Sequence, residues 1–387
     1  MLTRISIANN QFGEIMQFID LGAQRARIEA EVNQAIIDVV ASGKYILGPE
    51  VSEFEKRLAA YVGVKHVIGC ANGTDALIMP LMARGIGPGD AVFCPSFTFA
   101  ATAEAIALVG AEPVFVDIDP DTYNINVSQL AEAIFTIKKE SDLKPKAVIP
   151  VDLFGLAADF SGISGIAATE HLFVIEDAAQ SIGGQHDNMR CGAFGNVAAT
   201  SFYPAKPLGC YGDGGAMLTD DDELAETLRS ISFHGKGDSQ YDNVRIGINS
   251  RLDTIQAAIL LKKLSILEDE IQQRQLIAHR YANGLKDIVK VPEIGENTRS
   301  AFAQYTINVE QRDELKTYLQ EQSIPTMIYY TKPLHLQTAY AHYTRAPGGL
   351  PVSEELAARV LSLPMHPYLS RTDQNEIINA IRTFYKA

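Results

Sequence analysis

The central half of the chain alternates short apolar runs with stretches whose hydrophobic residues recur at helical spacing. After a first run at 66–70, further runs stand at 91–94, 113–116, 147–151, 172–176, 197–202 and 216–219. Apolar runs of this length suit strands that are buried on both faces, as in a parallel sheet covered by helices. The pattern therefore predicts a doubly wound α/β domain with a large, mostly parallel sheet.

The pattern changes after residue 252. A helix-rich stretch at about 252–286 comes first, and mixed elements follow at 304–309, 313–322, 353–361 and 372–385. We predict a large domain over 16–252, then an interdomain helix and a smaller C-terminal α/β domain over 253–387. No Ser- or Pro-rich linker separates these parts, so we expect them to pack tightly. Residues 1–15 are expected to be an N-terminal extension, to which we assign no function.

Composition narrows the class of protein. The chain has 387 residues, 47% hydrophobic and 21% charged, and its net charge of −14 argues against nucleic acid and anionic membrane surfaces as partners. No apolar run approaches the roughly 20 residues of a membrane span, and the start of the chain lacks the apolar core of a signal peptide. The cysteines show no metal-type spacing, so no metal site is expected; they are Cys70, Cys94, Cys191 and Cys210. A reducing cytoplasm suits this composition.

Candidate chemistry begins at Lys206, which stands between a predicted strand and a run of glycines within 201–215. An amine that attacks an aldehyde must be desolvated, poorly protonated and rigidly aimed, and the flanking prolines and glycines narrow its surroundings. The segment therefore predicts a Schiff-base lysine. An ordinary surface lysine in a turn is the alternative, and the neighbouring elements decide between the two.

Asp177 ends the predicted strand at 172–176 and precedes a Gly-rich turn. The carboxyl ends of strands in α/β sheets face the ligand crevice, and pyridoxal phosphate needs an acid there to keep its ring nitrogen protonated. Asp177 is our candidate for that partner. A helix N-cap is the alternative for an isolated aspartate, and Lys206 downstream favours the cofactor role.

Gly73 and Thr74 mark a third element, where the run at 66–70 meets a turn and then an apolar helical pattern. Glycine lets the backbone approach an anion, and the first N–H groups of a helix point toward it along the positive end of the helix dipole. The segment predicts a phosphate seat, with plain helix capping as the alternative.

The order of these elements resembles the fold-type I pyridoxal-phosphate enzymes and, within them, the DegT/DnrJ/StrS sugar aminotransferase family. The resemblance extends from about Met16 almost to the C-terminus. It is carried by segments at 43–50, 72–77, 95–102, 176–180, 201–215 and 247–252.

This resemblance implies that pyridoxal 5'-phosphate is the cofactor, with pyridoxamine phosphate formed in the half-reaction. Lys206 would bind the cofactor covalently and then serve as general acid/base, and Asp177 would hold the ring nitrogen. Gln180 would donate to the ring's phenolic oxygen, and Phe99 would stack on the ring.

The resemblance also assigns the phosphate group. Gly73, Thr74 and Ser201 would hold it, and Asn249 would reach it from the neighbouring subunit, which implies a homodimer with shared active sites. Two positions depart from the family: Asn72 replaces a common serine, and Asp152 replaces a common histidine, which we expect to alter the substrate side.

For substrates, the resemblance implies a nucleotide-linked keto-sugar and L-glutamate, which becomes 2-oxoglutarate. The segment 324–337 resembles the family's substrate-facing stretch, where small-domain core residues are the alternative. Candidate sugar contacts are Tyr45, His234, Arg245, Tyr329, Tyr330 and His335. Arg251 is common to the family, so we expect it at the dimer interface, whereas Arg245 is our reader of a sugar carboxylate.

The segments at 202–215 and 329–337 look most like enzymes that aminate a UDP-linked 3-oxo sugar, such as UDP-2-acetamido-2-deoxy-3-oxo-glucuronate, for surface polysaccharide (O-antigen) synthesis. Two alternatives stay open: an aminotransferase for a dTDP- or UDP-4-keto-6-deoxyhexose, and a non-catalytic regulatory member of the family. The sequence has no helix-turn-helix module or basic stripe to support the regulator.

Overall fold

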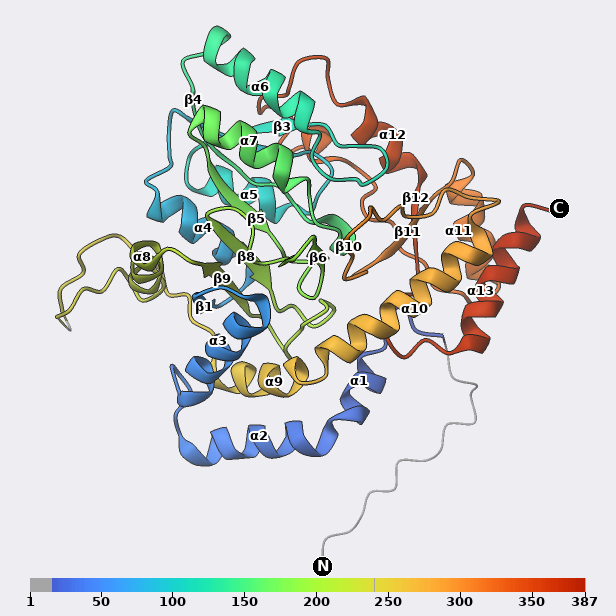
Figure 1. The fold of residues 1–387 in the computed structure, drawn as a ribbon, viewed down its shortest axis with the longest axis horizontal. Coiled ribbons are helices and arrows are strands. Elements are labelled where there is room, and N and C mark those ends of the chain that lie inside the picture. Colours follow the sequence, from blue (N-terminus) through green and yellow to red (C-terminus); the bar gives the residue numbers. More distant parts are fainter. Residues whose placement is uncertain (1–15, 240, 387) are drawn as a thin grey trace, which may run out of the picture.

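The computed structural model describes residues 16–239 and 241–386, and its centre is a seven-stranded sheet (Figure 1). The strands lie in the order β1-β9-β8-β5-β4-β2-β3. Every neighbouring pair is parallel except those of β9, which runs antiparallel to β1 and β8. The predicted mostly parallel sheet is thereby confirmed. Its strands are β1 (His66–Cys70), β2 (Asp90–Pro95), β3 (Glu112–Val116), β4 (Lys144–Val148), β5 (Phe173–Asp177), β8 (Val197–Ser201) and β9 (Gly215–Thr219).

Helices cover both faces of this sheet, because successive strand residues point to opposite sides. In β9, Met217 joins the core with α4, α5, α6, α7 and α8, whereas Ala216 and Leu218 join the core with α3, α9 and α10. The first group comprises α4 (Gly73–Ala83), α5 (Ala101–Leu108), α6 (Val127–Glu140), α7 (Phe160–Glu170) and α8 (Asp222–Ser232). The second comprises α3 (Pro49–Val62), α9 (Thr254–Leu264) and α10 (Leu267–Leu285).

The C-terminal part builds a smaller layer around a two-stranded antiparallel sheet. Its elements are β11 (Tyr305–Asn308), α11 (Arg312–Glu321), α12 (Pro351–Arg359), β12 (Val360–Leu363) and α13 (Arg371–Phe384). The sequence pattern did not separate β12 from the helix before it. The four residues of β12 are all buried against β11 and its neighbours, so tertiary pairing ends the helix there.

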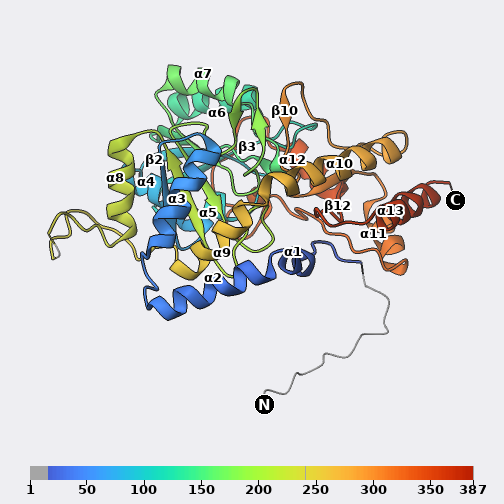
Figure 2. The same ribbon diagram turned by 60° about the horizontal axis from the view of Figure 1, so that its bottom comes forward.

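The first described residues connect the two ends of the chain. Phe18 accepts a backbone hydrogen bond from Met365 at 3.2 Å, and Met16 packs on the C-terminal core. The chain then forms α1 (Leu21–Arg27) and α2 (Glu29–Ser42), and α2 runs along α9 through Val32 and Ile259 (Figure 2). The predicted extension at 1–15 lies outside the described residues.

Short elements complete the fold. A three-stranded sheet joins β6 (Gln185–His186), β7 (Met189–Arg190) and β10 (Thr298–Arg299), and single 3-10 turns stand at η1 (Leu153–Gly155) and η2 (Leu334–Leu336). Among the described helices, none is long and apolar enough to cross a membrane.

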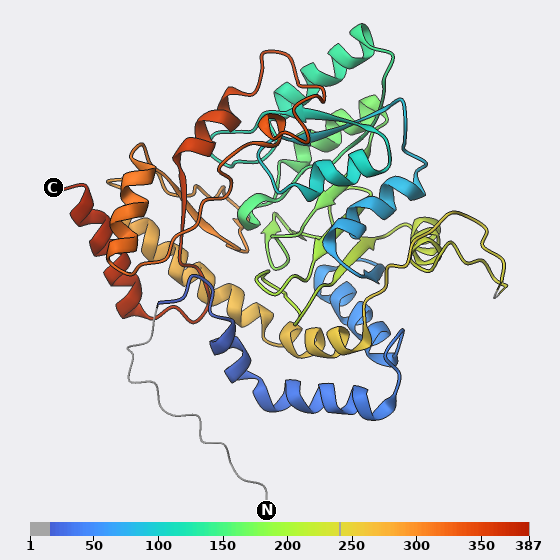
Figure 3. The same cartoon turned by 180° about the vertical axis from the view of Figure 1, so that it is seen from behind.

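Between α8 and α9 the chain projects away from the body as an exposed arm, of which residues 233–239 and 241–249 are described (Figures 1 and 3). Antiparallel bridges between Phe233 and Asn249 and between Lys236 and Asn243 hold its two sides together. Its apolar side chains face solvent in the single chain, with Tyr241 89% and Ile246 86% exposed.

Candidate active site

The carboxyl end of β5 supplies a buried carboxylate. Asp177 accepts hydrogen bonds from Thr102 Oγ1 at 3.0 Å and from the backbone N–H of Ala179 at 3.2 Å. Burial raises the pKa of Asp177, while these two bonds and the charge of Lys206 oppose the rise. The carboxylate is therefore fixed in position at the sheet edge where α/β proteins bind ligands.

Lys206 stands on the turn after β8, where its backbone N–H donates to the carbonyl of Tyr203 at 2.9 Å. Desolvation lowers the pKa of its amine, and attraction to Asp177 opposes that shift. A lysine with a lowered pKa carries more of the unprotonated amine at neutral pH, which is the form that attacks a carbonyl carbon.

The start of α4 lies directly against Ser201. A Cβ atom at Gly73 would come 2.7 Å from the Cβ of Ser201, so only glycine allows this approach. Asn72 caps the helix by accepting from the backbone N–H of Asp75 at 2.8 Å. Free N–H groups of a helix start, together with the hydroxyls of Thr74 and Ser201, form a donor set that suits a phosphate dianion.

An aromatic group borders the same edge. The ring of Phe99 is 59% exposed, and its centroid lies 6.4 Å from that of Tyr330. The hydroxyl of Tyr330 accepts from Gln180 Nε2 at 3.4 Å, and Gln180 Oε1 accepts from the backbone N–H of Phe154 at 2.6 Å. Tyr329 stacks edge-on to Tyr330 at 5.8 Å. The structure thus brings both tyrosines of the 324–337 segment to the predicted cofactor contacts.

His335 has a different setting. Its ring is buried, with Nδ1 2.6 Å from Ser96 Oγ and Nε2 3.1 Å from Glu354 Oε1. Both ring nitrogens are therefore paired within the chain. We propose that His335 fixes the 324–337 segment to the loop after β2 and does not contact sugar directly.

The remaining candidates lie on exposed segments. Tyr45 donates through its hydroxyl to the carbonyl of Val40 at 3.2 Å and stands beside the start of α9. His234, Arg245 and Asn249 belong to the arm. Asn249 accepts from Arg251 at 2.6 Å, which orients its amide. Among the described residues, no hydrogen bond or ring contact joins these side chains to Tyr330 or Lys206 of the same chain.

Sequence reasoning missed Thr102 and placed Asp152 on the wrong side. Thr102 lies three residues after Phe99, close to one helical turn, at the start of α5. This spacing was the signal in the sequence that could have placed Thr102 near the cofactor site, where its hydroxyl bonds to Asp177. Asp152 was expected to alter the substrate side. Its carboxyl instead points into the interior, where it accepts from Ser181 and from the backbone of Ala158.

These residues fit pyridoxal phosphate. The cradle between Gly73 and Ser201 suits a phosphate, the buried Asp177 suits a protonated ring nitrogen, and Lys206 offers an amine of lowered pKa. The exposed ring of Phe99 offers a stacking surface beside them. A sheet of this topology with these groups at its carboxyl edge defines a fold-type I pyridoxal-phosphate enzyme.

The chain belongs to the DegT/DnrJ/EryC1/StrS aminotransferase family, whose model matches residues 26–382. It is 50% identical over 356 residues to the UDP-2-acetamido-2-deoxy-3-oxo-D-glucuronate aminotransferase of Pseudomonas aeruginosa, covering 92% of this chain and 96% of that protein. The enzyme class and the cofactor inferred from the sequence are thereby confirmed: this protein is a pyridoxal-phosphate-dependent sugar aminotransferase.

Solved structures agree with this assignment. A family aminotransferase from Brucella abortus has a TM-score of 0.95 at 72% identity, covering 95% of this chain and 99% of that one. NtdA from Bacillus subtilis, solved with bound cofactor PMP, has a TM-score of 0.88 at 30% identity, covering 98% of this chain and 87% of that one.

Proposed function

We propose that the protein transfers the amino group of L-glutamate to UDP-2-acetamido-2-deoxy-3-oxo-glucuronate or a similar 3-oxo hexose in the cytoplasm, for surface polysaccharide such as O-antigen. The observation that carries this proposal is the 50% identity to the Pseudomonas aeruginosa enzyme over nearly the whole of both chains. The assembled Lys206, Asp177 and Tyr330 group gives the chemistry a place in this chain.

Each residue has a separate task in this scheme. When bound, pyridoxal phosphate supplies the electron sink that makes the proton on the substrate's amine-bearing carbon acidic. Lys206 Nζ would take up that proton from the amine-bearing carbon and return it to the cofactor within the same half-reaction, which the lowered pKa of the amine favours. Asp177 stays ionised opposite the ring nitrogen, and Gln180 and Tyr330 hold the phenolic edge.

We propose that two chains complete each site. The side chains of Tyr45, His234, Arg245 and Asn249 are exposed in the single chain, and the arm that carries three of them exposes Tyr241 and Ile246. Association through the arm would bury these apolar side chains and bring Asn249 to the phosphate seat of the partner. A homodimer with shared active sites follows.

Subunit complementation tests the shared site. In a heterodimer of Lys206→Ala and Asn249→Ala chains, one site carries both substitutions and the other carries none. We therefore expect a mixture of the two inactive variants, dissociated and reassociated, to recover up to about a quarter of parental activity if assortment is random, because half the dimers then have one intact site of two. The measurement is turnover, with oligomeric state followed by light scattering. A fully active monomer would contradict the shared site.

The sugar is tested by a panel of nucleotide-linked keto-sugars assayed with glutamate. If the substrate carries a carboxylate, Arg245→Ala should weaken its kcat/KM by about tenfold to hundredfold, the range of a charge-assisted hydrogen bond of about 1.5–3 kcal/mol. A neutral 6-hydroxy analogue should change little, and the glutamate half-reaction should be preserved.

Arg371→Ala is the matched control, because Arg371 is an exposed arginine at the start of α13, in the C-terminal part. Equal losses for acidic and neutral sugars would assign Arg245 to the nucleotide or the fold. Preference of the parent for a neutral 4-keto-6-deoxyhexose would replace the glucuronate proposal with the alternative sugar while keeping the aminotransferase class.

A further inference from the structure

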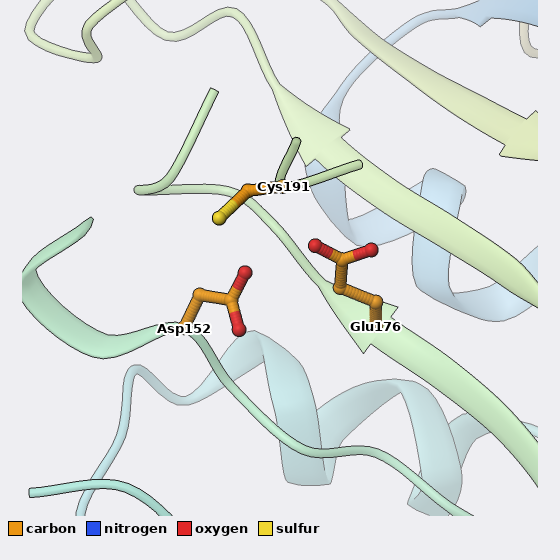
Figure 4. A group of neighbouring side chains, drawn as sticks. All are labelled: Asp152, Glu176 and Cys191. Carbon is orange, nitrogen blue, oxygen red and sulfur yellow. The ribbon is translucent and has the colours of Figure 1, made fainter. Parts of the chain in front are cut away.

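Directly behind Asp177 lies a buried cluster that the transamination chemistry does not use. Asp152, Glu176 and Cys191 are each fully buried, and their oxygen and sulfur atoms lie within 4.8 Å of one another. Figure 4 shows the three side chains pointing toward a common centre from β5, the loop before η1 and the segment after β7. Glu176 is the residue immediately before Asp177.

Neutral donors surround both carboxyl groups. Asp152 accepts from the backbone N–H of Ala158 at 2.9 Å and from Ser181 Oγ at 2.7 Å. Glu176 accepts from the backbone N–H of Gly192 at 2.6 Å and of Phe194 at 2.8 Å. In the described ranges, no lysine, arginine or histidine forms an ion pair with either of them.

Two ionised carboxylates in this setting would be costly, since burial removes their hydration and no cation replaces it. Asp177 adds a third negative charge beside Asp152. A proton between the two carboxyl groups removes the repulsion and forms a strong hydrogen bond, as in other carboxyl pairs that share a site.

We propose that Asp152 and Glu176 share a single proton, and that this hydrogen-bonded link is a positioning device that holds Asp177 and Gln180 against the cofactor. The proposal does not depend on which sugar the enzyme uses.

The proton resides on Glu176. Burial and the charge of Asp152 together raise the pKa of Glu176 well above its ordinary value, whereas burial raises the pKa of Asp152 to about 6. Cys191 remains a thiol, because burial and the two carboxyl groups raise its pKa. The charged groups facing the pair are thus Asp177 and, beyond it, Lys206.

The Asp152–Glu176 hydrogen bond can position Asp177 and Gln180, because the segments that carry these two residues are bonded to Asp152. The backbone N–H of Asp152 donates to the carbonyl of Asp177 at 3.1 Å, and that of Asp177 donates to the carbonyl of Pro150 at 2.9 Å. Ser181, bonded to Asp152, directly follows Gln180. Loosening the Asp152–Glu176 contact would therefore free both cofactor-facing side chains at once.

Infrared spectroscopy of the holoenzyme in ²H₂O at about pH 7 tests the proton directly. The parent should show the C=O stretch of a protonated carboxylic acid, and Glu176→Gln should lose it. Asp117→Asn is the matched control, since Asp117 is buried and accepts from the backbone N–H groups of Val352 and Ser353. That variant should keep the band. Absence of the band in the parent, or one bound metal ion per chain by elemental analysis, would overturn the proposal.

The stability of the same proteins gives a second readout. A carboxyl group whose pKa is raised by folding stabilises the protein below its unfolded pKa, and this contribution is lost as pH rises toward the folded pKa. From about pH 6 to 8, the parent's folding equilibrium constant should therefore fall about tenfold more per pH unit than that of Glu176→Gln. Equal slopes would mean that Glu176 is ionised in the native enzyme.

Kinetics separates positioning from plain packing. Asp152→Asn keeps an acceptor for Glu176 and for Ala158 and can donate to the Ser181 hydroxyl, whereas Asp152→Ala removes the link. We expect Asp152→Ala to lower kcat by about tenfold to hundredfold, with KM for the keto-sugar nearly preserved. Asp152→Asn should keep most of the parental kcat. Equal impairment of both variants, with folding intact by circular dichroism, would refute the positioning role.

Discussion

Lys206→Ala should abolish transamination, with a loss of more than about 10⁴-fold, because the covalent step and the proton transfer both need this amine. No other described side chain combines a lowered amine pKa with a position beside Asp177. Turnover with glutamate and a keto-sugar is the measurement, and the visible absorbance of the lysine-bound cofactor should disappear with it.

Lys139→Ala provides the control for that experiment, since Lys139 is an exposed lysine on α6. It should retain parental turnover and absorbance. Near-parental turnover of Lys206→Ala would show that another group performs the chemistry.

Asp177→Asn should lower kcat by about 10²- to 10³-fold while leaving cofactor bound, since it removes a preorganised charge but little volume. The amide oxygen can still accept from the backbone N–H of Ala179, and the NH2 group that replaces Oδ2 can donate to the Thr102 hydroxyl, so the local fold should persist. Cofactor content after dialysis and kcat are measured together. Loss of cofactor with intact chemistry on readdition would instead assign Asp177 to binding alone.

Thr102→Val tests how much the hydrogen bond from Thr102 to Asp177 contributes to kcat. It deletes the hydroxyl that donates to Asp177 at 3.0 Å and keeps a similar volume. A smaller loss than that of Asp177→Asn is expected, because the carboxylate remains and only one of its bonds is missing.

The two halves of the site differ physically. The Lys206 group stands beside strand ends and helix starts, and backbone N–H groups hold the side chains of Asp177 and Gln180. The arm group stands in solvent in the single chain. A division of this kind places the chemistry on the rigid scaffold and the candidate sugar contacts on an exposed segment. Substitutions in the arm should therefore change sugar preference more than the glutamate half-reaction.

The local pattern of apolar residues was sufficient to predict the main sheet and to identify two residues of the active site. The apolar runs between 66 and 219 each overlap one of the seven strands of the main sheet, since a strand buried on both faces is apolar. At β4 the overlap is limited to Ala147 and Val148, because the first residues of that strand, 144–146, include two exposed lysines. Lys206 and Asp177 were identified because each stands at the end of such a strand, beside glycines that a turn requires. These signals lie within a few residues of the side chain concerned.

Contacts between distant segments needed the tertiary structure. The antiparallel direction of β9, the approach of Gly73 to Ser201 and the bond from Thr102 to Asp177 join residues far apart in the chain. His335 has a sugar-binding residue type, yet Ser96 and Glu354 occupy both of its nitrogens. Asp152 faces Glu176 and not the substrate side for the same reason. A sequence specifies which polar groups a segment carries, but only packing determines which of them find partners inside the protein and which remain free to bind a ligand.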